Sequence, residues 1–191
     1  MPLVPATLEK DVLAIFVAMD DILDETGEDY QAEKMAKAVK KYILTGVTST
    51  SDSGSISGNS YSGTGTGIMT IDADSLEADL AKTFKKRSDN PTLAANMATD
   101  IDKACSAANT VTETSVGNGS GPAIGKFSGD KTKISVPLAA CFEAMNGMRT
   151  GGGNEYYAKQ FSLGVHAYLT AGTITVQLKS PLSGSGSGKI T

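Results

Sequence analysis

The residue types that most often perform chemistry in proteins are sparse in this chain. It has one histidine, His166, and two cysteines, Cys105 and Cys141. One imidazole and two thiols on separate predicted helices do not form the cluster of nitrogen and sulfur ligands that a bound zinc ion needs. His166 follows directly after Val165, an expected core residue, so we favour a surface or hydrogen-bonded histidine over a general base. We therefore expect no metal site and no cofactor.

Two other segments resemble ligand-binding motifs but lack required residues. The acidic residues 20–29 are not spaced like the alternating oxygen ligands of a calcium loop, which favours a solvated turn between helices. Residues 121–126 resemble a phosphate-binding loop, yet Ser120 occupies the place of its first glycine and Phe127 replaces its metal-binding hydroxyl. The many serines and threonines have no neighbouring base to activate them. The sequence therefore supports no enzymatic mechanism.

A threefold internal repeat organises the elements that carry these residues. Each copy contains what we call the alanine frame: Ala, then Met or Phe three positions later, Ala or Ser after four, and Val or Ile after seven. This spacing places all four side chains on one face of a helix. The first alanines are 62 and 64 positions apart. The three copies are Ala32, Met35, Ala36, Val39; Ala94, Met97, Ala98, Ile101; and Ala158, Phe161, Ser162, Val165.

The flanks of the frame repeat as well. A helix precedes each copy, with a phenylalanine four positions after an aliphatic residue: Val12 and Phe16, Leu80 and Phe84, Leu138 and Phe142. A threonine-rich strand, a Ser/Gly loop and a short closing strand follow each copy, and we place the closing strands at residues 67–71, 133–136 and 188–191. The second copy is degenerate, because Ala104 stands where the others have Tyr42 and Tyr168.

These patterns predict an α+β protein built of three tandem repeats, each a helical hairpin followed by a β-hairpin, with approximate internal threefold symmetry. We place the repeats at residues 1–73, 74–136 (the degenerate copy) and 137–191. A unit of about 60 residues is marginal alone, so we expect one shared core. Its members should include the three phenylalanines and the last frame residues, Val39, Ile101 and Val165. The helices are expected at residues 8–23, 30–44, 76–87, 93–108, 137–148 and 155–170.

Composition narrows the range of partners. The formal net charge of −4 disfavours binding to nucleic acid, which requires clustered lysine and arginine. The first residues lack the basic start and apolar run of a secretory signal, and no apolar stretch is long enough to cross a membrane. We expect folding in a reducing cytoplasm, with Cys105 and Cys141 as buried thiols rather than a disulfide.

The Ser/Gly-rich segments at residues 48–66, 112–130 and 176–188 are the most plausible partner-binding regions. Their hairpins would project as arms or pair edge to edge with neighbouring chains. Four apolar residues within these segments are predicted to contact partners: Ile56, Tyr61, Phe127 and Leu182.

One resemblance points to a class of protein. The helix end Tyr-Leu-Thr-Ala-Gly-Thr-Ile-Thr at 168–175, together with Gly-Ser-Gly-Ser-Gly-Lys-Ile-Thr at 184–191, resembles small structural proteins of tailed bacteriophages. Those proteins occur in single- and multi-repeat forms among head and tail genes. The resemblance implies a non-catalytic virion component, made in the host cytoplasm, that decorates the capsid or belongs to the neck or tail. Its partners would be copies of itself and other virion proteins, with no nucleic acid, membrane or small-molecule substrate.

Two other classes remain open at this point. A host-surface adhesin or fibre-type binding module would need exposed specificity residues, for which Tyr61, Tyr156 and Tyr157 are the candidates. A small enzyme or binding protein would need a deep pocket with convergent polar groups.

Overall fold

The structure is a computed structural model that describes residues 2–20, 22, 27–56, 59–86, 88–116, 119–148, 152–180 and 182–191, without the side chains of residues 56, 61, 109 and 111–120. In this described part, two helices are followed by two strands three times in succession. The chain is therefore an α+β protein. The elements are α1 (Pro5–Met19), α2 (Gly27–Ile43), β1 (Thr48–Ile56), β2 (Asn59–Thr70), α3 (Ala73–Lys85), α4 (Asn90–Ala107), β3 (Asn109–Val116), β4 (Gly119–Ser128), α5 (Thr132–Asn146), α6 (Gly153–Ala171), β5 (Thr173–Leu178) and β6 (Ser183–Ile190).

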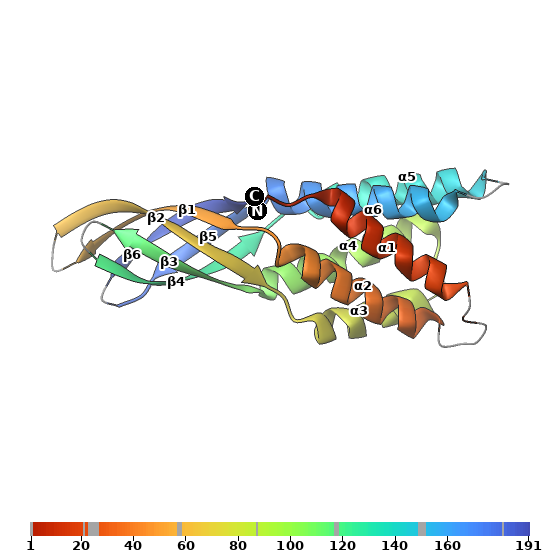
Figure 1. Cartoon of the computed structure of the whole chain (residues 1–191), viewed down its shortest axis with the longest axis horizontal. Helices are drawn as coiled ribbons and strands as arrows, with labels where there is room; N and C mark the ends of the chain where they lie inside the picture. Colours follow the sequence, from red (N-terminus) through yellow and green to blue (C-terminus); the bar gives the residue numbers. More distant parts are fainter. Residues whose placement is uncertain are drawn as a thin grey trace.

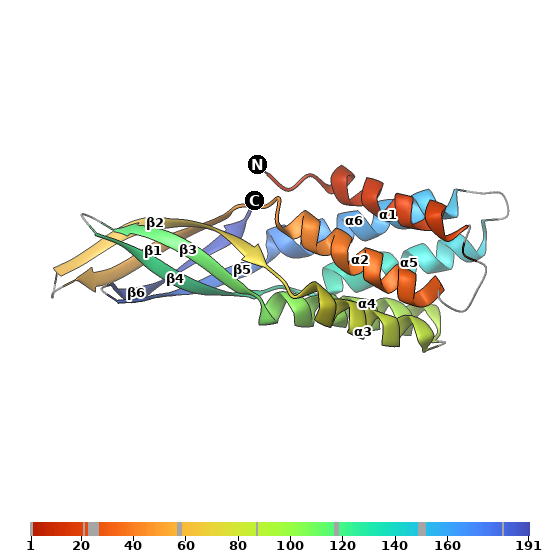
Figure 2. The same ribbon diagram turned by 60° about the horizontal axis from the view of Figure 1, so that its bottom comes forward.

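The helices form one end of an elongated molecule and the strands form the other (Figure 1). Helices α2, α4 and α6 each lead into a strand, so their carboxyl ends face the strands. Helices α1, α3 and α5 run in the opposite sense and end far from the strands (Figure 2). Both chain termini lie where the two halves meet. No helix in the described residues has both the length and the apolar content required to cross a lipid bilayer.

The alanine frame lies at the centre of the helical bundle. Each helix packs on the next one in chain order, and α6 packs on α1, which closes the helices into a ring. All twelve frame residues are at most 1% exposed, including Val39, Ile101 and Val165, whose burial was predicted. The frame residues of α2, α4 and α6 all belong to one hydrophobic core inside this ring, apart from the buried Ser162. One continuous hydrophobic core extends from this bundle into the strands.

The three phenylalanines differ from the prediction. Val39, Ile101 and Val165 are fully buried, whereas Phe16, Phe84 and Phe142 are only partly buried. The phenylalanines lie near the ends of α1, α3 and α5, on the side away from the strands, where the bundle opens to solvent.

Helix α5 begins five residues earlier than the expected Pro137. Residues 133–136, predicted as a closing strand, are helical, and the second β-hairpin ends at Ser128. The Asp130 carboxylate accepts hydrogen bonds from the Thr132 backbone N–H at 3.0 Å and from its hydroxyl at 2.7 Å, which starts the helix. Pro137 then lies inside α5 and cannot donate to the Lys133 carbonyl. That carbonyl faces Gly164 of α6, where an added Cβ would be 3.1 Å from the oxygen.

The six described strands pair antiparallel in chain order, and β6 pairs with β1 to close a barrel. Side chains alternate between its interior and exterior: Ile174, Val176 and Leu178 of β5 are buried, while the residues between them are exposed. Each described strand has a neighbour on both sides within the chain. The prediction that the hairpins pair edge to edge with neighbouring chains is therefore wrong for the described strands, because the hairpins use those edges for one another.

Glycines set the width of the barrel where it closes. Gly184, Gly186 and Gly188 alternate along β6. A Cβ on Gly188 would collide with the backbone of Ser49 in β1, and one on Gly186 would collide with the buried Asp52 carboxylate. The hydroxyl groups of Thr48, Thr50 and Thr110 are also buried, and the structure gives these three no hydrogen-bond partner within its described residues. The interior of the barrel is thus partly polar.

Replacing Gly188 by valine should destabilise the protein, because the new side chain cannot fit between β1 and β6. We expect the free energy of unfolding to fall by about 1–3 kcal/mol. The matched control is Ser187→Val, which places the same side chain on the exposed face of β6 and should change stability by about 0.5 kcal/mol or less. Urea denaturation of both variants measures the difference, and equal stabilities would contradict the close approach.

Candidate binding site between α3 and α4

The structure places two of the four predicted partner-binding residues inside the chain. Phe127 and Leu182 are each 3% exposed. The Phe127 ring packs edge to face on Tyr168 with ring centroids 5.2 Å apart. Both residues belong to the hydrophobic core, so their side chains have no surface to offer a partner. Ile56 and Tyr61 belong to β1 and β2, but their side chains lie outside the described part of the structure.

The histidine and the two cysteines have structural roles: the histidine is hydrogen-bonded and the cysteines are buried. His166 is partly buried and its Nδ1 lies 2.8 Å from the Tyr42 hydroxyl, which agrees with the hydrogen-bonded histidine expected from the sequence. Cys105 and Cys141 are buried and free, also as expected. Burial raises the pKa of the Cys105 thiol to about 12, so this thiol is protonated and unreactive near neutral pH.

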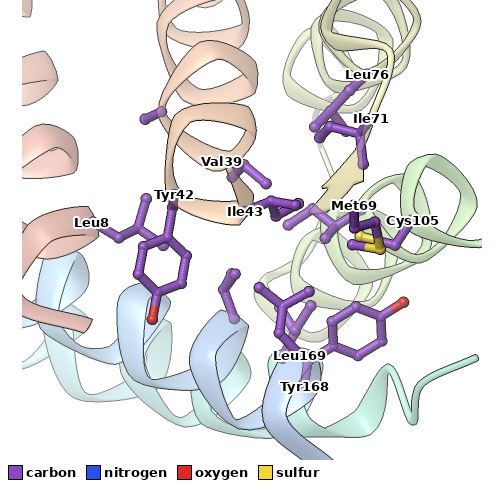
Figure 3. Close-up of a cluster of buried hydrophobic side chains, with 14 of the residues drawn as sticks. Leu8, Val39, Tyr42, Ile43, Met69, Ile71, Leu76, Cys105, Tyr168 and Leu169 are labelled. Carbon is purple, nitrogen blue, oxygen red and sulfur yellow. The ribbon is translucent and has the colours of Figure 1, made fainter. Parts of the chain in front are cut away.

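Two tyrosines occupy matching positions in the bundle. Tyr42 in α2 and Tyr168 in α6 each lie ten positions after the first alanine of their frame. The Tyr42 hydroxyl is hydrogen-bonded to His166 of α6, and the Tyr168 hydroxyl donates to Asp102 Oδ1 of α4 at 2.7 Å. His166 and Asp102 each lie eight positions after the first alanine of the frame in their own helix. Figure 3 shows both rings in the core, with Tyr42 extending from α2 toward α6. The two rings are at most 1% exposed.

The third matching position has no ring. Ala104 of α4 lies ten positions after Ala94, and Lys40 of α2 lies eight positions after Ala32. Beside Ala104, between α3 and α4, is a pocket of about 550 Å³ that we call the Ala104 pocket. The sequence shows the missing tyrosine, but not that a pocket opens beside it. The lining residues are Thr70, Asp72, Ser75, Leu76, Asp79, Lys103, Ala104, Ala107 and Ala108.

The Ala104 pocket combines an apolar wall with a charged rim. Leu76 and the three alanines form the wall. On the rim, hydrogen bonds from the Ser75 hydroxyl and backbone lower the pKa of Asp72, and the nearby charge of Lys40 lowers it further. A hydrogen bond from Lys103 lowers the pKa of Asp79. The two carboxylates are thus ionised at neutral pH, and Asp79 is paired with Lys82 and Lys103. This pocket suits a ligand that is apolar along its body and polar at one end.

A second pocket, which we call the aromatic pocket, lies at the end of the bundle away from the strands. Its volume is about 220 Å³. The Tyr157 ring is central to it, with ring centroids 5.1 Å from Phe16 and 5.7 Å from Phe142. The Tyr157 hydroxyl lies 3.9 Å from the sulfur of Met97. The lining residues are Phe16, Glu28, Gln31, Phe84, Leu93, Met97, Phe142, Met145 and Tyr157.

The Tyr42 hydroxyl should make stability depend on pH in the alkaline range. Burial raises its pKa from 10.0 to about 12, so the folded state holds this proton more tightly than the unfolded chain does. The resulting stability is complete below about pH 10 and is lost as the pH rises toward about 12. Tyr42→Phe removes this titration, so its free energy of unfolding should fall less steeply across that window than that of the wild type.

Urea denaturation at several pH values from 9 to 12 tests this expectation. Ser185→Ala, which removes an exposed hydroxyl from the barrel, serves as the control and should keep the slope of the wild type. A slope for Tyr42→Phe equal to that of the wild type would contradict the assignment.

Comparison of this chain with protein-family models, with curated proteins and with solved structures gives no match.

Proposed function

We propose that this protein is a non-catalytic structural component of a tailed-bacteriophage particle, where it binds and holds neighbouring subunits of the capsid, neck or tail. The observation that carries this proposal is the aromatic pocket. One phenylalanine from each of α1, α3 and α5 reaches the same end of the bundle and stays partly exposed there. An open cluster of aromatic and methionine side chains is typical of a surface that binds another protein.

The two ends of the molecule have opposite chemistry. The outward positions of β6 are exposed serines, Ser183, Ser185 and Ser187, whereas the far end of the bundle is aromatic. Because the barrel is closed, the described strands offer no edge on which other chains could stack. These properties are expected of a protein that is fixed on a larger particle. The aromatic end of the bundle would attach to the particle, and the hydrophilic barrel would project from it.

We further propose that the chain derives from three copies of one helix–helix–strand–strand unit related by an approximate threefold axis. Three features support this. The elements recur in the same order, the alanine frame is buried in all three copies, and the hydroxyls of Tyr42 and Tyr168 bond to matching positions. On this proposal, the second and third copies would start with α3 at Ala73 and α5 at Thr132. The axis would pass between Phe16, Phe84 and Phe142 and present them together to one partner.

A host-surface adhesin has weaker support. Of the candidate specificity residues, Tyr157 is 3% exposed and packs within the bundle. The hollow at the free end of the barrel is about 500 Å³ and is lined by serine and glycine, namely Ser53, Gly54, Ser55, Ser60, Ser183 and Gly184. Such a surface lacks the aromatic anchors that dominate tight recognition.

The proposal is tested by asking whether the chain is present in purified particles of the virus that encodes it, and whether the aromatic pocket holds it there. Phe84→Asp places a charge in the pocket and should reduce the amount of the chain in gradient-purified particles at least tenfold. The matched control, Val136→Asp, changes a 65% exposed apolar residue outside the pocket and should leave that amount unchanged. Circular dichroism checks that both variants are folded.

Absence of the wild-type chain from particles contradicts the proposed function, and binding of the free protein to host cells would then favour the adhesin. Incorporation of Phe84→Asp at the level of the wild type contradicts the role of the aromatic pocket.

A further inference from the structure

We propose that the Ala104 pocket is a binding site for a para-hydroxyphenyl group, the ring that tyrosine supplies at the two matching positions of the bundle. This inference does not depend on the proposed function. Three independent features carry it: the shape of the site, its apolar wall, and the charges at its rim.

The shape argument comes from the two occupied positions. The ring of Tyr42 lies beside Leu8 of α1 (Figure 3). Leu8 precedes Val12 by four positions, and Leu76 precedes Leu80 by four, so Leu76 is the counterpart of Leu8. Leu76 lines the Ala104 pocket. The fold therefore provides the wall against which a ring packs, while Ala104 supplies no ring.

The apolar wall and the volume determine the size of the ligand. A volume of about 550 Å³ falls within the range of about 300–1,000 Å³ that is usual for small-molecule sites. Ala104 and Ala107 lie one turn apart on α4, and their small side chains line the pocket together with Leu76. An aromatic ring can pack on such an apolar wall.

The rim determines the polar group on that ring. Tyr42 and Tyr168 direct their hydroxyls at His166 and Asp102, and Lys40 occupies the corresponding position for the third site. The charge of Lys40 also acts on Asp72, which lines the pocket. A phenol bound in the pocket can donate a hydrogen bond to the Asp72 carboxylate.

The rim favours a neutral ring over an aromatic carboxylate. Asp72 and Asp79 both line the pocket, and Asp79 is already paired with Lys103. A carboxylate on the ring would therefore lie near two groups of its own charge. A phenol with its ordinary pKa near 10 is neutral at physiological pH and avoids this repulsion.

The test measures binding of p-cresol, the side-chain analogue of tyrosine, to the full chain. Isothermal titration calorimetry and ligand-observed NMR detect this binding. We expect a dissociation constant of about 1 mM or tighter. Toluene, which lacks the hydroxyl, should bind at least tenfold more weakly. Absence of p-cresol binding, or equal binding of toluene, would overturn the proposal.

Variants locate the site. Ala104→Tyr supplies the ring within the chain and should weaken p-cresol binding at least tenfold while raising the melting temperature. Ala95→Tyr makes the same change on an exposed face of α4 and should bind p-cresol as the wild type does. If Ala104→Tyr does not fold, Ala107→Leu narrows the same pocket at its rim and should weaken binding likewise. Wild-type affinity in a folded variant of either position would overturn the assignment.

A phenol group could belong to a free small molecule or to a tyrosine of another protein, and N-acetyl-tyrosinamide distinguishes them. This probe carries a peptide group on both sides of the ring-bearing carbon. Binding of both probes supports the site with a tyrosine side chain as its occupant. Binding of p-cresol alone supports the site with a free phenol as its occupant, because the pocket then excludes a polypeptide backbone.

Discussion

Closure of a ring is the constraint on which this structure depends. The barrel exists only because β1 pairs with β6, with Thr48 opposite Ile190. Just beyond that pair, Val47 and Thr191 exchange two backbone hydrogen bonds of 3.0 and 2.9 Å. The helices obey the same constraint, since α1 packs on α6. The Ser/Thr/Gly strands have few apolar side chains to offset the entropy lost on ordering. Closure of the barrel offsets this loss of entropy in another way, because every described strand then has two neighbours for its backbone hydrogen bonds.

The sequence predicted the helices well because the alanine frame combines the helical period with small residues at the positions of closest approach. It could not predict the barrel. Alternating glycine and serine in β6 indicate a strand, but they do not specify which strand lies beside it. The predicted start of α5 was wrong for a different reason. Ile134 and Val136 are β-branched and favour a strand locally, yet the turn at Asp130 and Thr132 and the packing of α5 on α6 favour a helix.

The candidate site was visible in the sequence only in part. The predicted repeat places Ala104 where a tyrosine would be expected. The partners of Tyr42 and Tyr168 come from other helices, however, and the periodicity of the sequence does not reveal them. Phe127 and Leu182 show the opposite error. They lie in segments rich in serine and glycine, which suggested exposed positions. Phe127 lies in β4, where the alternation of strand side chains turns it inward. Leu182 lies just before β6, and its backbone N–H donates to the Lys179 carbonyl while its side chain is buried. In both cases the missing information was the contact between distant segments.

The pairing of β1 with β6 also bears on how the chain acquires its fold during synthesis. Val47 and Thr191, at the end of that pairing, are 144 positions apart. The ribosome releases β1 and β2 long before β6, so the outer edge of β1 stays unpaired while the remaining two thirds of the chain are made. Helices need only local contacts and can form in that interval, whereas a barrel closed by its first and last strands must form late and slowly. Until β6 is available, the sheet therefore keeps an open edge on β1, and such an edge is a site at which chains can aggregate.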